Sequence, residues 1–176
     1  ALDHSSPKFA VGGKLGLDCT GDEITELGII LLKDNELLER MKAITSEVKD
    51  LKQYFTDTKN PIAVISVEKT RNQKYLFEDL KPLFEHIKIL IIVENNKNDV
   101  NNSYMLVWRV ANNIDSNRDL FIDGHTMCLD ATNKNAFDNF NRRWPDDVDC
   151  TKEVLDSLRE RKILDVSDEF INKFYL

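Results

Sequence analysis

The sequence of 176 residues has little of what several protein classes depend on. Its three cysteines, Cys19, Cys128 and Cys150, are odd in number and widely spaced, which fits neither a disulfide framework nor a zinc site. The longest apolar run, residues 87–93, contains Lys88 and is far shorter than the ~20 residues that cross a bilayer. These absences argue against a secreted disulfide scaffold and against membrane insertion, and we expect a reducing, cytoplasmic location.

Positive charge is also in short supply. Lys and Arg number 24 against 31 Asp and Glu, which gives a net charge of −7 and a pI of about 5.0. This balance argues against general attraction to nucleic acid or to an anionic membrane. The hydrophobic content of 41% and the charged content of 31% are ordinary for a globular domain, and the length fits one domain with a tail from its neighbour.

A Leu-Asp-x-Thr motif occurs twice, within residues 15–20 and again within residues 127–134. Each copy follows an apolar step, as expected where a strand ends in a polar turn. The first copy has a long lead-in that includes the Gly-Gly-Lys of residues 12–14, and the second has almost none of it. We therefore expect residues 1–23 to be the closing segment of a preceding domain, residues 61–150 to be a second, degenerate copy, and the whole chain to be a fragment of a longer protein.

Hydrophobic patterning predicts an open, largely parallel α/β sheet built from βαβ units, with helices on both faces. Residues 62–67 and 89–93 are apolar and rich in β-branched side chains, as strands covered on two sides should be. A helix over residues 75–87 separates them, with Pro82 expected to kink it. A second helix is expected over residues 104–114, and a third short strand over residues 120–122.

Two further helical regions are predicted outside this core. In residues 36–55 the apolar residues recur at alternating steps of four and three, which is typical of one long helix. Residues 24–60 would then be a helical connector, and the apolar stripe would be core or, alternatively, a surface for another chain. The stripe consists of Leu37, Met41, Ile44, Val48, Leu51 and Phe55. Residues 151–176 are expected to be a helical C-terminal tail.

The candidate catalytic residues do not form a recognisable active site. His86 and His125 lie at an element end and in a turn, where structural roles are expected, and residues 12–14 lack the spacing of a phosphate-binding loop. Trp144 is expected to anchor the tail by packing. Several acids follow strands, where ligands of α/β sheets often bind, but none has a spacing diagnostic of metal. They are Glu94, Asp99, Asp115, Asp119, Asp123 and Asp130. We assign no catalytic residue and no metal ligand, and leave the cofactor-binding residues open.

Several short motifs occur along the chain in an order that resembles that of a known protein family. A helix with Trp108 is followed by Arg118-Asp119, by residues 129–134 and by the Trp-Pro pair at 144–145, and residues 1–20 repeat the closing segment. This ordered set resembles the C-terminal domain of the UbiD family of carboxy-lyases. The residues that bear the motifs are Gly12, Gly13, Lys14, Asp18, Trp108, Arg118, Asp119, Asp130, Thr132, Lys134 and Trp144.

The resemblance implies a parent enzyme similar to 3-polyprenyl-4-hydroxybenzoate decarboxylase, which acts in quinone (menaquinone or ubiquinone) biosynthesis. Such enzymes decarboxylate aromatic or α,β-unsaturated acids on prenylated flavin mononucleotide (FMN), with a divalent metal such as manganese and with potassium. The family's catalytic Glu-Arg-Glu set and most of its flavin and metal ligands precede this domain, so none is assigned to this chain. The chain also departs from the family at residues 94–96, where Glu-Asn-Asn replaces the usual Asp.

We therefore expect this chain to bind no cofactor itself, to be inactive alone, and to serve assembly or stability of the parent. Its expected partners are its own catalytic domain and further copies in a homo-oligomer, with no nucleic acid and no membrane insertion. The alternative is a stand-alone α/β module for interaction or for small-molecule binding.

Overall fold

The computed structural model describes residues 28–174. The predicted closing segment at residues 1–23, with Gly12, Gly13, Lys14 and Asp18, lies outside these residues.

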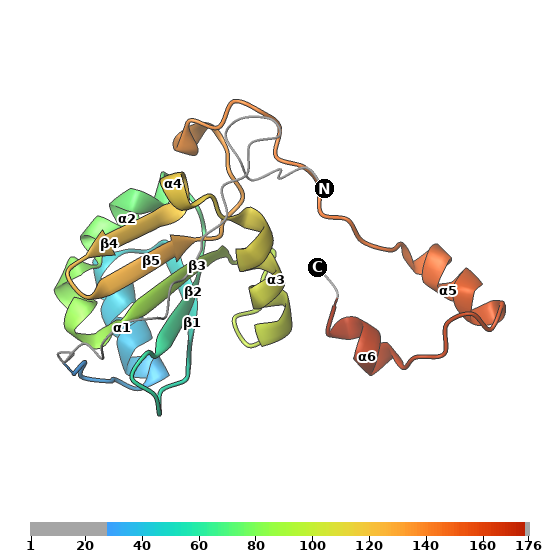
Figure 1. The fold of residues 1–176 in the computed structure, drawn as a ribbon, viewed down its shortest axis with the longest axis horizontal. Coiled ribbons are helices and arrows are strands. Elements are labelled where there is room, and N and C mark those ends of the chain that lie inside the picture. Colours follow the sequence, from blue (N-terminus) through green and yellow to red (C-terminus); the bar gives the residue numbers. More distant parts are fainter. Residues whose placement is uncertain (1–27, 175–176) are drawn as a thin grey trace, which may run out of the picture.

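A five-stranded mixed sheet forms the centre of the structure, in the order β1-β2-β3-β5-β4 (Figure 1). Strands β2 (Ile62–Val67), β3 (Ile89–Glu94) and β5 (Thr126–Asp130) are parallel neighbours. Strands β1 (Val48–Tyr54) and β4 (Leu120–Asp123) pair antiparallel at the two edges. The predicted open and largely parallel α/β sheet is confirmed, and so are the strands predicted at residues 62–67, 89–93 and 120–122.

Helices cover both faces of the sheet. Side chains alternate between the two faces along each central strand, so the apolar strands present a hydrophobic surface on each face. Ala63 and Ile65 of β2 join a core cluster with Leu37 and Met41 of α1 (Asp34–Ile44). This first face also carries α2 (Gln73–Asp79) and the 3₁₀ helix η1 (Lys81–His86). Val64 points to the second cluster, which α3 (Ser103–Asn113) covers. The connections that follow β2 and β3 therefore leave toward opposite faces.

The single long helix predicted for residues 36–55 is wrong. Helix α1 ends at Ile44, and Val48 begins strand β1, which belongs to the same sheet although we expected residues 24–60 to be a helical connector. A bulge between Val48 and Asp50 shifts the register with β2. An extra residue at a bulge lets side chains three apart face the same side, so Val48 and Leu51 are both buried at a helix-like spacing.

The helix predicted over residues 75–87 is split in two. Helix α2 ends at Asp79, and Pro82 lies in the first turn of η1, where its missing N–H costs no helical hydrogen bond. The Asn72 side chain caps α2 by accepting a hydrogen bond from the Lys74 N–H. Asn102 caps α3 in the same way, by accepting a hydrogen bond from the Met105 N–H.

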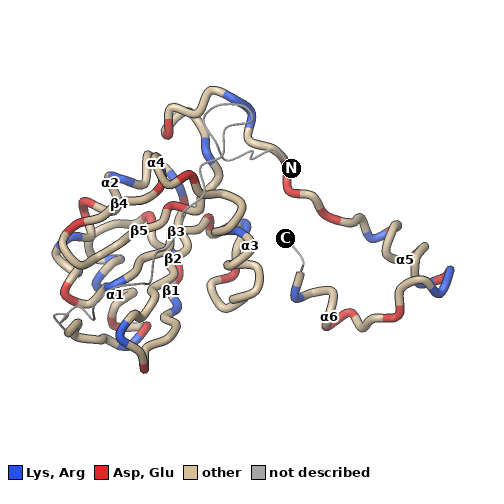
Figure 2. The backbone as a smooth tube through the Cα atoms, in the orientation of Figure 1, with Lys and Arg blue, Asp and Glu red and all other residues tan. Residues whose placement is uncertain are grey.

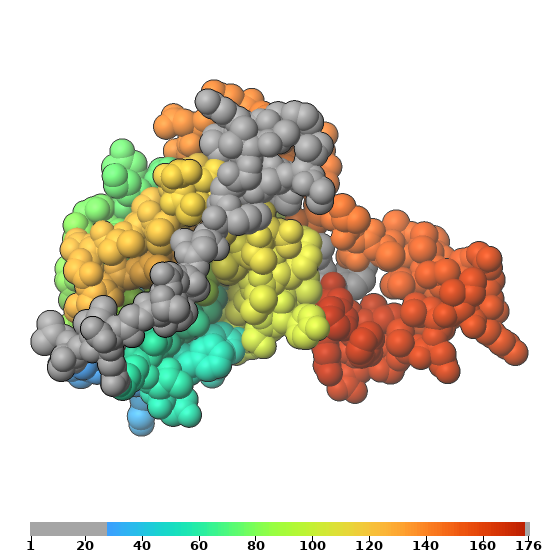
Figure 3. Space-filling view, viewed as in Figure 1, coloured from blue at the N-terminus to red at the C-terminus, as the bar shows by residue number. Residues whose placement is uncertain are grey.

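The C-terminal segment forms the predicted helical tail, with α5 (Lys152–Glu160) and α6 (Asp168–Asn172). Both helices lie away from the sheet, and the end of α6 returns to the side of α3 (Figures 1 and 3). There the Phe174 ring packs edge-on against Tyr104 at 5.0 Å between centroids, and Asn102 donates a hydrogen bond to the Lys173 carbonyl. None of the helices within residues 28–174 has the length and apolar character needed to cross a membrane.

The burial of α1 leads to a stability prediction. Met41 has no exposed surface, so Met41→Lys would bury an unpaired ammonium, and we expect it to lower the free energy of unfolding by ~4 kcal/mol in urea titrations. The matched control is Glu39→Lys, which lies exposed on the same helix and should change it by less than ~0.5 kcal/mol. An unfolding free energy unchanged by Met41→Lys, combined with a changed oligomeric state, would show that the stripe is instead an interaction surface.

Candidate functional site

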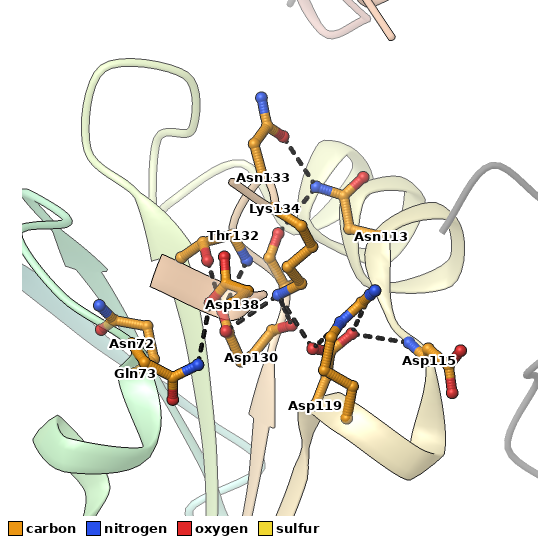
Figure 4. A network of polar contacts seen from close by, with 12 residues as sticks. Asn72, Gln73, Asn113, Asp115, Asp119, Asp130, Thr132, Asn133, Lys134 and Asp138 are labelled. Atoms are coloured by element: carbon orange, nitrogen blue, oxygen red, sulfur yellow. Dashed lines mark hydrogen bonds and ion pairs between the residues drawn. The ribbon is translucent and has the colours of Figure 1, made fainter. Parts of the chain in front are cut away.

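A buried network of charged and amide side chains lies where β5 ends (Figure 4). It joins the loop after β5 to α3, to the short helix α4 (Ser116–Asp119) and to the residues after β2. Lys69, Arg118 and Lys134 face Asp119, Asp130 and Asp138 within it. Most of these side chains have lost almost all contact with solvent, so each charge depends on its partners in place of water.

The second Leu-Asp-x-Thr motif forms a tight turn at the start of this network. The Asp130 carboxylate accepts one hydrogen bond from the Thr132 N–H at 3.0 Å and another from the Thr132 hydroxyl at 2.6 Å, both at Oδ1. Aspartate makes such turns because its short side chain reaches the backbone two residues ahead. The spacing of Asp and Thr in the motif is therefore the spacing of the turn.

Lys134 supplies the charge that the turn requires. Its ammonium, which is 0% exposed, lies 2.9 Å from Asp130 Oδ2 and 3.3 Å from Asp119 Oδ1. It also donates to the Asp130 carbonyl oxygen at 2.8 Å. An ammonium has three donors, and these three acceptors use all of them.

Lys69 plays the same part on the other side of the motif. It follows β2 and donates to the Thr132 hydroxyl oxygen, to the Asn133 carbonyl oxygen and to Asp138 Oδ2, at 2.9, 2.9 and 2.6 Å. Asp138 lies in the short 3₁₀ helix η2 (Ala136–Asp138), whose first turn it closes by accepting from the Asn135 N–H. The loop after β5 is thereby fixed to the end of β2.

Arg118 and Asn113 complete the network. Arg118 makes a two-pronged contact with its neighbour Asp119, with both nitrogen–oxygen distances at 2.7 Å. Its third nitrogen, Nη1, is buried and has no partner within residues 28–174. The Asn113 amide donates to the Ala131 carbonyl at 2.9 Å and to the Asn133 side chain at 3.0 Å, so α3 is also attached to the loop.

The two aspartates that face Lys134 have opposite shifts in pKa. Burial raises the pKa of Asp130, but the charges of Lys134 and Lys69 and the Thr132 hydrogen bond outweigh it, and the pKa lies below its usual value. Burial dominates at Asp119 and raises the pKa, although Arg118 and Lys134 oppose the rise, and the charge of Asp130 adds to it. Asp130 is thus the firmly ionised partner.

The structure brings together five of the predicted motif residues, Arg118, Asp119, Asp130, Thr132 and Lys134. Trp108 and Trp144 lie outside the network. Trp144 packs against the Phe140 ring at 5.2 Å between centroids, in agreement with its predicted packing role. The two described histidines contact backbone carbonyls, His86 that of Ile30 and His125 that of Phe84, as structural histidines do. No group of His, Cys, Asp or Glu within residues 28–174 could hold a metal ion.

Lys69 and Asp138 belong to the network but were missed by sequence reasoning. Lys69 gave no recognisable signal, because its partners are distant in the sequence. Asp138 did give one, since Asn135 and Asp138 have the spacing of a capping box, and both of its hydrogen bonds are present.

The position of Lys134 leads to a prediction about folding. Lys134→Met removes the charge but keeps much of the chain volume, and it leaves Asp119 and Asp130 buried together. We expect the unfolding free energy to fall by about 3–5 kcal/mol in urea titrations. Lys74→Met, at an exposed position of α2, is the control and should have little effect. Equal unfolding free energies of the two variants would mean that the ion pairs of Lys134 with Asp119 and Asp130 contribute nothing to stability.

The opposite pKa shifts predict an order of protonation. As the pH falls, Asp119 should take up its proton before Asp130, which carbon-detected NMR titration of the side-chain carboxyls can follow. Asp130 has the lowered pKa, so its stabilising contribution is complete above its unfolded value of ~3.9 and is lost as the pH falls through the folded value. Asp119 has the raised pKa, so its contribution exists at low pH and is lost as the pH rises through the folded value. The reverse order of protonation would contradict the charge arrangement described here.

Comparison with known proteins adds sequence relatives to this geometry. Two Helicobacter pylori proteins, from strains J99 and 26695, are 44% and 43% identical to this chain over 179 aligned positions. Both are described as "Uncharacterized protein". These alignments cover 100% of this chain and 29% of each relative, so the chain spans less than a third of their length.

Solved structures of UbiD-class enzymes share the fold. An evolved dimeric form of HmfF from Pelotomaculum thermopropionicum, in complex with prenylated FMN, matches with a TM-score of 0.52 at 22% identity, over 74% of this chain and 29% of that one. Vanillic acid decarboxylase of Sedimentibacter hydroxybenzoicus matches with a TM-score of 0.51 at 18% identity, over 73% of this chain and 31% of that one.

The family comparison covers most of the described chain. The sequence profile described as "3-octaprenyl-4-hydroxybenzoate carboxy-lyase C-terminal domain" matches residues 29–144, which include the whole sheet and the buried network. The resemblance found in the order of motifs is confirmed, and the chain belongs to the UbiD family, as a C-terminal domain.

Proposed function

We propose that this chain is the C-terminal part of a longer decarboxylase that acts on an aromatic acid in quinone biosynthesis, and that the domain itself serves assembly or stability. The observation that carries this proposal is that the buried lysines and aspartates of the network are paired with one another, although Arg118 Nη1 has no partner among the described residues. The family's motif residues here are used to hold one another in place.

The hydrogen bonds of the motif support a structural role. All three donors of Lys69 and all three donors of Lys134 are occupied by groups of the chain itself. A general acid or base must exchange its proton with a substrate, and a binding residue must offer it a free donor or acceptor. Asp130 is held ionised between the two lysines and accepts from Thr132, so it has little capacity left for either task.

Prenylated FMN and its metal do not fit the described residues. The lysines of the network have no donor left for a flavin phosphate, and residues 28–174 hold no set of side chains suited to a metal ion. We therefore place flavin, manganese and potassium in the preceding part of the parent, and derive no chemical step from this chain.

The comparisons support the wider proposal in different ways. The description of the family profile names octaprenyl-hydroxybenzoate, a polyprenylated aromatic acid, as the substrate, which suits a step in quinone synthesis. HmfF binds prenylated FMN, and its evolved form is dimeric, which makes the same cofactor and a homo-oligomer reasonable for the parent. Acidic and basic residues are interspersed along the described chain (Figure 2), which supports the proposal that the domain has no nucleic-acid or membrane partner. We propose a cytoplasmic location for the parent. We further propose that residues 1–23 close the preceding domain of the parent and that residues 61–150 are its degenerate second copy.

An experiment with two protein lengths tests the proposal. The 176-residue chain and the complete natural protein that contains it would each be incubated with prenylated FMN, manganese and potassium. Flavin binding would be followed by absorbance, and decarboxylation of 3-polyprenyl-4-hydroxybenzoate by product analysis. We expect the complete protein to bind the cofactor and to release CO₂, and the 176-residue chain to do neither.

Lys134→Met in the complete protein separates structure from chemistry. We expect it to lower the thermal stability or the assembly state while the decarboxylation rate per correctly folded, flavin-loaded protein stays within about twofold. Stoichiometric flavin binding by the 176-residue chain alone would overturn the non-catalytic assignment. A complete protein that never binds flavin would overturn the enzymatic one.

A further inference from the structure

A second feature, distinct from the buried network, lies at the carboxyl ends of the two central parallel strands. There a pocket of about 410 Å³ opens between the residues that follow β2 and those that follow β3. The chain leaves β2 toward the face covered by α2 and leaves β3 toward the face covered by α3. Adjacent parallel strands whose connections diverge in this way create the crevice in which open α/β sheets usually bind small ligands. The lining residues are Val67, Glu68, Lys69, Glu94, Asn95, Asn96 and Asn135.

The cations near this pocket are already paired. Lys69 gives its donors to the network, with Asp138 at 2.6 Å. Lys97 and Arg109 lie close enough to affect Glu94, but Asp147 holds both, at 3.1 and 2.8 Å. Lys69, the cation that lines the pocket, therefore has no donor left for a phosphate.

Acceptors and amide donors, in contrast, are available. The half-buried Glu94 carboxyl has a raised pKa, mainly because burial removes water and only partly offset by Lys69 and by the Asn133 backbone amide. Asn95 accepts from Ser66 through its oxygen, and Asn135 accepts from the Phe137 N–H, which leaves the amide nitrogen of each without an acceptor among the described residues. Asn96 is exposed at the rim.

We propose that this pocket binds a small neutral ligand with vicinal hydroxyl groups, such as a pentose or the ribose of a nucleoside. One carboxylate accepts hydrogen bonds from two adjacent hydroxyls, and asparagine amides donate to the hydroxyl oxygens. The Glu94 carboxyl disfavours phosphorylated ligands, whereas the charge of Glu68 is offset by Lys49 at 2.9 Å. The pocket volume lies in the range typical of small-molecule sites.

NMR titration of the isotopically labelled 176-residue chain tests this proposal with D-ribose as the probe. We expect the side-chain amide signals of Asn95, Asn96 and Asn135 to shift together, with a Kd on the order of 1 mM. 2-Deoxy-D-ribose, which lacks one hydroxyl, should bind about tenfold more weakly. D-ribose 5-phosphate should bind no more tightly than ribose.

Variants locate the binding and separate it from folding. Glu94→Gln should weaken ribose binding about tenfold, whereas Glu39→Gln on the remote helix α1 should leave it unchanged. If Glu94→Gln does not fold, Asn96→Ala at the exposed rim provides the second test and should also weaken binding. The proposal fails if ribose leaves these amide signals unmoved at about ten times the expected Kd, or if ribose 5-phosphate binds more tightly than ribose. Neither result would bear on the decarboxylase assignment, which depends on the complete protein.

Discussion

The buried ammonium of Lys134 is the contact on which the closing part of the sheet depends. It is fully buried, and its acceptors among the described residues belong to Asp119 and Asp130, which come from α4 and from the end of β5. A charge in this position is tolerated because its partners are in place, and each partner is tolerated for the same reason. Chain segments 11 residues apart must therefore arrive together, and the antiparallel pair β4–β5 brings them there.

The same dependence gives the motif residues a structural task in this domain. The donors and acceptors of Asp130, Thr132 and Lys134 bind one another and hold the loop after β5 in place. Lys69 has a similar structural role, since its hydrogen bond to the Asn133 carbonyl joins the end of β2 to the loop after β5. The pocket lined by Lys69 differs from the network, because its side-chain amides and the Glu94 carboxyl are not bonded to one another in a closed set.

How much could be predicted from the sequence depends on the distance between the interacting residues. The central strands were predictable because continuous apolar runs directly reflect burial on two faces. The helix over residues 36–55 was mispredicted because the bulge in β1 gave Val48 and Leu51 the spacing of a helical stripe. Arg118, Asp119, Asp130, Thr132 and Lys134 were identified through the order of family motifs, but their mutual contacts were not. Lys69 and Asp138 are 69 residues apart, and no local sequence pattern predicts a contact between residues so far apart.

The two Leu-Asp-x-Thr motifs can now be compared in physical terms. The turn between Asp130 and Thr132 needs just those two side chains, and the first motif has both, as Asp18 and Thr20. Burial of the aspartate needs a cation as well, which Lys134 supplies four residues after Asp130. The first motif has Asp22 at the corresponding position. Residues 130–134 therefore contain both the aspartate that makes the turn and the cation that neutralises it, so the loop after β5 is stabilised by charges from its own sequence.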